Sequence, residues 1–188
     1  MCLALTVTAV LIKEKTKSFD VYISPSKQVD NEYAAGDTTE AEQMYLIGER
    51  VCEILEDRGI SVYMPDVNSD SLSARVDQAK RYKAKAYVAI HSNAGGGEGT
   101  ECFYNENSEE SRSLAENVYS RAASVTPTED RGLKSGNKAN LYEATEPTCA
   151  SCLVEVEFHD DEDKAIWITE HTEELAVAVA DGITEYLH

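Results

Sequence analysis

Two patterns of apolar residues alternate along this chain, one typical of strands and one typical of helices. Short, mainly apolar runs occupy residues 21–23, 60–64, 86–90, 100–104 and 153–158. Runs of this length predict strands, and strands that are apolar on both faces are typical of a sheet covered by helices on both sides. Between them, apolar residues recur every three or four positions, which predicts crossover helices. The order predicts an α/β fold in one domain, with a mostly parallel twisted sheet flanked by helices on both faces.

The helical pattern is clearest after residue 38. Thr38 or Thr39 can cap a helix there, and Gly59 can end it. The apolar positions with helical spacing are Met44, Ile47, Val51, Ile54 and Leu55. Further helices are expected near residues 73–84, over 109–125, around 166–168 and over 173–186. Residues 130–146 are polar and are expected to form a long loop. Residues 100–104 are expected to form an edge strand.

The first residues read differently from the rest. Residues 1–11 are apolar but too short to cross a bilayer, and they lack the basic opening and cleavage site of a signal peptide. Residues 5–10 alternate as an edge strand does, although a remnant of an upstream leader is an alternative. We therefore expect an N-terminal extension or edge strand over residues 1–18 and a catalytic domain over 19–188.

Composition excludes several classes of partner. The chain has 188 residues and a formal net charge of -18, without a compensating basic cluster, so nucleic acid is not an expected partner. We expect no membrane insertion and a monomer. The five cysteines do not form a disulfide framework, and the Cys149/Cys152 pair lacks a second pair at zinc-finger spacing, so they are expected to be mainly buried thiols.

Candidate chemistry gathers at the predicted carboxyl edge of the sheet. His91 ends one predicted strand, Glu155 lies inside another, and Glu40 lies at the start of the first helix. Histidine and glutamate are donors for a catalytic zinc, which also needs a carboxylate to move a proton. Alternatives stay open: His91 as an ordinary polar residue, Glu40 as a favourable charge at a helix N-terminus, and Glu155 as half of an ion pair.

Four segments together resemble the zinc-dependent N-acetylmuramoyl-L-alanine amidases of the amidase type 3 family, which includes autolysins and endolysins. Residues 89–94 (A-I-H-S-N-A) resemble the family's S-I-H-x-N-A, and residues 153–158 (L-V-E-V-E-F) resemble its L-V-E-x-G-F. The third is residues 39–44, which resemble the helix start with the acidic ligand. The fourth consists of residues 131–134 and 140–142, which resemble the segment before the catalytic strand. The resemblance covers roughly residues 20–187.

The resemblance implies Zn2+ as the cofactor and peptidoglycan or muropeptides as the substrate. Glu40 and His91 would be metal ligands, with Glu42 as a weaker substitute for Glu40. Glu155 would be the catalytic carboxylate that takes a proton from a metal-activated water and returns it to the leaving amine. Asn93 and Arg131 are candidate substrate contacts.

One departure from the family pattern stands out. The family has D-P-G-H-G after its first strand, where this chain has S-P-S-K-Q at residues 24–28, so the usual first histidine ligand is missing. Gln28 offers a carbonyl oxygen as an alternative ligand. His159 follows the catalytic strand and, by the period of two, shares the face of Glu155. It is a candidate replacement ligand. The alternatives are that the site binds metal weakly and that His159 has a supporting role around the metal.

The leading interpretation is a peptidoglycan amidase that cuts between N-acetylmuramic acid and L-alanine. The alternatives are a catalytically inactive muropeptide-binding module and a metallohydrolase that acts on another amide. The resemblance implies a bacterial protein that acts outside the cell or at the cell wall, or one that is cytoplasmic before release if it is a phage endolysin.

Overall fold

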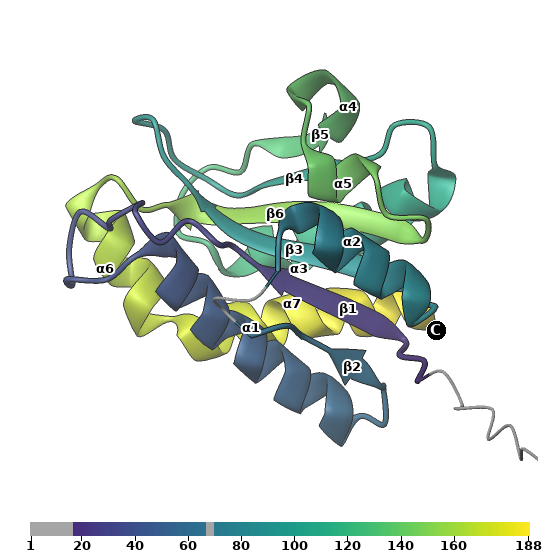
Figure 1. Ribbon diagram of the computed structural model, residues 1–188. Coiled ribbons are helices and arrows are strands. Elements are labelled where there is room, and N and C mark those ends of the chain that lie inside the picture. The colour runs from purple at the N-terminus through teal and green to yellow at the C-terminus, as the bar shows by residue number, and fades with distance from the viewer. Residues whose placement is uncertain (1–16, 67–69) are drawn as a thin grey trace, which may run out of the picture.

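Six strands form one sheet in the order β2-β1-β3-β6-β4-β5 (Figure 1). The structure is a computed structural model that describes residues 17–66 and 70–188. The strands are β1 (Val21–Pro25), β2 (Val62–Tyr63), β3 (Ala86–Asn93), β4 (Glu101–Tyr104), β5 (Gly132–Ser135) and β6 (Ala150–Phe158). The edge strand expected within residues 5–10 lies outside the described residues, as does most of the expected N-terminal extension.

Most of the strand pairs are parallel. The pairs β1·β2, β1·β3, β3·β6 and β4·β5 are parallel, and β4 runs antiparallel to β6. The predicted fold class, a mostly parallel sheet with helices on both faces, is therefore confirmed. Because β1, β3 and β6 are parallel neighbours, their carboxyl ends meet at one edge of the sheet, where ligands bind in open α/β folds.

Helices cover both faces of the sheet (Figure 1). They are α1 (Glu40–Asp57), α2 (Leu72–Arg81), α3 (Glu109–Val125), α4 (Gly136–Ala139), α5 (Tyr142–Thr145), α6 (Glu162–Glu170) and α7 (Thr172–Leu187). The larger core cluster joins α1, α3 and α7 to one face through residues such as Val88 and Val154. A smaller cluster on the opposite face joins α2 and α5 to Tyr87 and Leu153.

Helix α1 begins where its capping residues predict. The Thr39 side chain accepts a hydrogen bond from the Glu42 backbone N–H, and the Glu42 carboxylate accepts one from the Thr39 N–H at 3.1 Å. This reciprocal capping satisfies two backbone donors that the first turn would otherwise leave open. The helix ends before Gly59, whose φ of +78° suits a residue without a Cβ. The cap places Glu40 in the first turn, at the carboxyl edge of the sheet.

Three predictions about the central and edge strands were wrong. Strand β3 continues through His91 to Asn93, so the histidine lies within the strand rather than after it. Residues 130–146 are not one loop but contain β5, α4 and α5. Because β5 pairs with β4, the predicted edge strand is an inner strand. Strand β5 and helices α4 and α5 are each only four residues long, which is too short for a strand or helix period to appear in the sequence.

Strand β6 contains a register shift that changes which side chains share a face. His91 pairs with Glu155, but Asn93 pairs with Phe158, so β6 has one more residue than β3 between the two pairs. An extra residue reverses the alternation of side chains beyond it. The expectation that His159 shares the face of Glu155 was therefore wrong, because it extended a period of two across a bulge.

Candidate active site

Glu40 and His91 are in direct contact at the carboxyl edge of the sheet. His91 Nδ1 lies 2.9 Å from Glu40 Oε1, and the Glu40 side chain is fully buried. Asn31 donates a hydrogen bond to the other Glu40 oxygen at 2.7 Å. Burial alone would raise the pKa of Glu40, but its bonds to His91, Ser26 and Asn31 outweigh that effect and lower it. Glu40 is therefore an anion that faces an imidazole.

A second carboxylate, Glu143, faces the other nitrogen of the His91 ring. Glu143 Oε2 lies 3.6 Å from His91 Nε2, which is ion-pair range but longer than a hydrogen bond. Burial opposes the charged form of His91, yet the Glu143 and Glu40 carboxylates prevail and raise its pKa to about 10. Without a metal the ring is therefore protonated at neutral pH, and it must release a proton to become a ligand. The sequence analysis missed Glu143, because a single glutamate in a four-residue helix has no periodic signal.

Glu155 lies beside this pair on β6. It is paired in register with His91 on β3 and with Glu101 on β4, so the three side chains share one face of the sheet. Burial raises the pKa of Glu155 to about 7, although the His91 charge opposes the shift. Its Oε2 atom is buried and has no hydrogen-bond partner. A carboxyl group that titrates near neutral pH is suited to take a proton and return it.

The neighbouring carboxylate Glu101 organises the two predicted substrate contacts. Asn93 donates to Glu101 Oε1 at 2.7 Å, and Arg131 donates to Glu101 Oε2 at 2.5 Å. Lys134 binds the same oxygen, and the Arg131 guanidinium lies 5.1 Å from the centre of the Phe158 ring. Burial would raise the pKa of Glu101, but the two cations outweigh it and lower it. Arg131 is 37% exposed, so part of its guanidinium remains accessible at the rim of the site.

His159 occupies the other side of β3. Its Nδ1 lies 2.9 Å from Ser92 Oγ, and its ring stacks on Tyr33 with centroids 4.7 Å apart. The residue is fully buried, and its Nε2 has no hydrogen-bond partner. Burial lowers the pKa of His159 despite the nearby Glu40 charge. The imidazole is therefore neutral at pH 7, the form that can bind a metal.

The two alternative ligands lie in different surroundings. Gln28 is exposed in the loop after β1, and its Oε1 is 3.4 Å from the Asn31 amide that binds Glu40. The Glu42 carboxylate is used in the helix cap, where it also accepts a hydrogen bond from Thr38. Glu40 is thus the carboxylate of this helix start that contacts His91.

Comparison with known proteins identifies the family to which this fold belongs. The family model described as N-acetylmuramoyl-L-alanine amidase matches residues 21–185. The chain belongs to this amidase family. The match includes every candidate site residue, from Gln28 to His159.

Solved amidases share the architecture of this family member. AmiC2 of Nostoc punctiforme superposes with a TM-score of 0.78 at 26% identity, covering 89% of this chain and 96% of that one. The catalytic domain of CwlV from Paenibacillus polymyxa gives the same score and identity and covers 89% of this chain and 97% of that domain.

A curated relative matches this family member over part of the relative's own length. It is an uncharacterised cell wall amidase of Bacillus anthracis that is 37% identical over 130 residues. The match covers 63% of this chain but 24% of that protein, so the chain spans about a quarter of its length.

The donors of this family member fit part of a zinc site. Within residues 17–66 and 70–188, no three His, Cys, Asp or Glu side chains are arranged to hold one ion. Glu40 and His91 nevertheless form a carboxylate and imidazole pair, and the buried Nε2 of His159 lacks a partner. Uncompensated buried polar atoms are costly, and these are the donor types that zinc prefers. Glu40 and His91 thus fit two of the positions of a zinc site.

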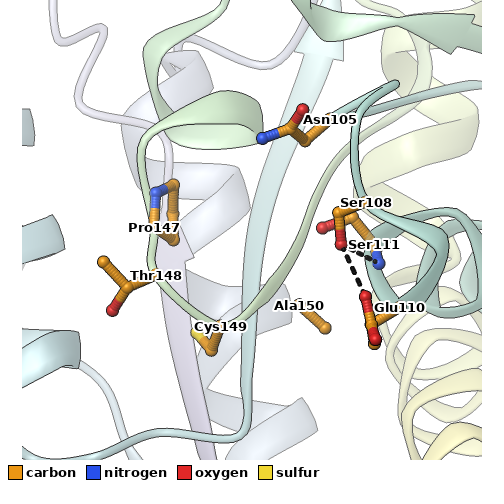
Figure 2. Close-up of a pocket in the computed structure, with 8 residues that line it drawn as sticks. All are labelled: Asn105, Ser108, Glu110, Ser111, Pro147, Thr148, Cys149 and Ala150. Carbon is orange, nitrogen blue, oxygen red and sulfur yellow. Dashed lines mark hydrogen bonds between the residues drawn. The ribbon is translucent and has the colours of Figure 1, made fainter.

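A separate pocket of about 260 Å³ lies at the opposite end of β6 (Figure 2). Its wall includes Cys149 and Ala150, the first residue of β6, together with Ser108 and Ser111 at the start of α3. Cys149 and Cys152 are free thiols; Cys152 is buried, as expected, whereas Cys149 is partly exposed. The pocket lies beyond the amino end of the strand that carries Glu155, so it is not part of the amidase site.

Proposed function

We propose that this chain hydrolyses the amide bond between N-acetylmuramic acid and L-alanine in peptidoglycan. The observation that carries the proposal is Glu155, whose pKa is raised to about 7 beside the Glu40–His91 pair. Membership of the amidase family and the likeness to two amidases at 26% identity support the same activity.

Zinc is the proposed cofactor, held by Glu40 and His91. His159 is the proposed third ligand, because its neutral imidazole is buried with Nε2 free. Gln28 is the alternative, since its exposed amide is one hydrogen bond from Asn31 and two from Glu40. When bound, zinc supplies a Lewis acid that makes water more acidic and stabilises negative charge on the substrate carbonyl oxygen.

Glu155 supplies the proton transfers. Its carboxylate takes a proton from water as the water oxygen bonds to the lactyl carbonyl carbon. The same proton then passes to the L-alanine nitrogen as the carbon–nitrogen bond breaks, so the products are a lactyl carboxylic acid and a free amine. A single carboxyl group with a pKa near 7 can perform both transfers, and no covalent intermediate is needed.

Arg131 and Asn93 are proposed to position the substrate. Arg131 is fixed on Glu101 and remains partly exposed, so its free edge can bind a carboxylate of the stem peptide. Asn93 holds the other Glu101 oxygen and keeps this arrangement beside Glu155.

The place of action follows from the substrate. We propose that the chain acts as a monomer on the bacterial cell wall, outside the cell, or after release from the cytoplasm if a phage encodes it. None of the helices in the described part of the chain has the length and apolar content needed to span a lipid bilayer.

Mass spectrometry of digested peptidoglycan tests the proposal. The purified chain is incubated with peptidoglycan after treatment with a chelator and again after zinc is restored. The expected result is zinc-dependent release of stem peptides that begin with L-alanine. Binding of muropeptides without release would favour a catalytically inactive binding module, and release from a different amide would favour another metallohydrolase.

A further inference from the structure

Glu143 is a buried acid outside the set of residues that the sequence points to. It lies on α5, in the connection between β5 and β6, and is 2% exposed. Removing a carboxylate from water costs several kcal/mol unless compensating interactions are present. A buried carboxylate such as Glu143 therefore needs hydrogen-bond donors or positive charges close to it.

Those partners come from two neighbouring strands of the sheet, β1 and β3. Ser24 on β1 and Tyr87 on β3 both donate hydrogen bonds to Glu143 Oε1. The other oxygen, Oε2, faces His91 Nε2 at 3.6 Å. Glu143 is therefore held at one oxygen by two hydroxyl donors, with its other oxygen directed at His91.

A buried arginine stabilises this arrangement from behind. Arg75 on α2 is fully buried and donates to Ser24 Oγ at 3.0 Å and to the Pro25 carbonyl oxygen at 2.6 Å. Ser24 in turn donates to Glu143. The positive charge of Arg75 thus lies one hydroxyl group from the Glu143 carboxylate, which offsets part of the cost of burying it.

The His91 ring consequently lies between two carboxylates. Glu40 contacts Nδ1 at 2.9 Å and Glu143 faces Nε2, which otherwise has no hydrogen-bond partner. A histidine binds a metal through one ring nitrogen only if the proton resides on the other. A carboxylate that faces the second nitrogen fixes both the position of that proton and the orientation of the ring.

We propose that Glu143 is a positioning residue that holds His91 with its proton on Nε2 and its Nδ1 lone pair directed at the zinc site beside Glu40. The inference rests on the proposed function, because it concerns the same metal site. Glu143 does not touch the substrate or the metal in this account. It acts only through His91, and Ser24, Tyr87 and Arg75 keep it in place.

Zinc affinity, measured by competition with a chelating dye, tests the proposal. The Glu143→Gln variant keeps the size of the side chain but removes its charge, and is expected to bind zinc about 10- to 100-fold more weakly than the wild type. The control is Glu106→Gln, which removes an exposed carboxylate whose partner is Lys138, and should leave zinc affinity unchanged. The melting temperature of each metal-free variant is measured in parallel.

Each outcome decides a different question. Weaker zinc binding in a Glu143→Gln variant whose metal-free melting temperature matches the wild type supports positioning. Equal zinc affinity in that variant overturns it and leaves Glu143 with a structural role. If the wild type binds no zinc, the ligand assignment and this inference both fail, whereas zinc binding without hydrolysis contradicts only the proposed activity.

A second variant covers the case in which Glu143→Gln does not fold. Glu143→Asp keeps the charge within the network but withdraws it from His91 by one methylene group. It is expected to weaken zinc binding, and an affinity equal to that of the wild type would overturn the inference.

Discussion

Glu155 illustrates how position changes the chemistry of an ordinary side chain. Burial raises its pKa to about 7, while the Glu40 carboxyl on the other side of His91 is held below its usual pKa by hydrogen bonds. Two glutamates in one site thus take different protonation states near neutral pH. The difference separates a proposed proton carrier from a proposed ligand.

The Glu155→Gln substitution is expected to lower kcat for amide hydrolysis by at least about 100-fold, because the amide cannot take a proton from water. Its stability should be unchanged or higher, since the substitution removes a carboxyl group with an unpartnered buried oxygen. Hydrolysis of a soluble muropeptide and thermal unfolding measure the two effects. Activity close to that of the wild type would remove Glu155 from the mechanism.

Because the family's first histidine ligand is missing, the third zinc ligand must be another residue, and His159 and Gln28 are the candidates. If His159 is that ligand, His159→Ala is expected to lose bound zinc, while Gln28→Ala keeps it. The metal content of the purified variants measures this directly. Because Gln28 is exposed and His159 is buried, the two outcomes separate a ligand in the loop from one behind β3. Full zinc content in His159→Ala would leave that residue with a role in packing against Tyr33.

At the level of single residues, the sequence predicted which residues belong to the site better than it predicted which residues contact one another. It indicated Glu40, His91 and Glu155 because each stands at a recognisable point of a long element. It could not indicate Glu143 or Arg75, because their roles depend on contacts between α2, α5 and the strands that no local pattern encodes. It misplaced His159, since nothing in the residue types marks the extra residue in β6.

At the level of elements, Asp20 joins the starts of the first three strands. It accepts hydrogen bonds from the backbone and hydroxyl of Ser61 and forms an ion pair with Lys85 at 2.8 Å. The hydrogen bonds from Lys85 and Ser61 lower the pKa of Asp20 to about 2. The folded state therefore favours the ionised form.

This shift predicts how stability depends on pH. The contribution of Asp20 is present above its unfolded pKa of about 3.9 and is lost as the pH falls through about 2. Asp20→Asn should destabilise the chain at pH 7 by less than about 1 kcal/mol, because Lys85 is exposed and Asp20 is partly exposed, so solvent screens the ion pair. The difference from the wild type should vanish near pH 2. Urea unfolding across this range measures it, and a constant difference would contradict the assignment.

Close packing of α3 and α7 makes a second prediction at this level. A Cβ at Gly182 would lie 2.6 Å from the Cα of Val118 and 2.7 Å from the carbonyl oxygen of Asn117. Gly182→Ala should therefore destabilise the chain by about 1 to 3 kcal/mol, since two helix backbones must separate. The control is Val177→Ala at a 36% exposed site on the same helix, which should cost less. Equal unfolding midpoints for the two variants would show that the helices can move apart.

The long elements were predictable from sequence because their periods are long enough to read. The capping residue before α1 and the apolar runs of β1, β3 and β6 gave the sheet and its helices, and Glu109–Val125 was predicted with its observed bounds. Strand β5 and helices α4 and α5 were missed because four residues with a polar exterior do not show a period. Their position is set by pairing with β4 and by packing on β6.

At the scale of the whole molecule, the net charge of -18 opposes contact with anionic cell-wall polymers. Raising the ionic strength from about 10 mM to about 150 mM shortens the screening distance from roughly 30 Å to about 8 Å. Hydrolysis of intact cell walls should therefore speed up over this range, while hydrolysis of a small soluble muropeptide changes less. A fall in the rate on intact walls would show that attraction, rather than repulsion, governs the encounter.

The account depends on one chemical event, the attack of water on the lactyl carbonyl. Digestion of a defined muropeptide in water enriched in 18O, followed by mass spectrometry of both products, tests it most directly. The account predicts one 18O atom in the lactyl carboxylate and an unlabelled stem peptide with a free L-alanine amine. An 18O atom at a sugar reducing end or within the stem peptide would place the cleavage at another bond and contradict the account.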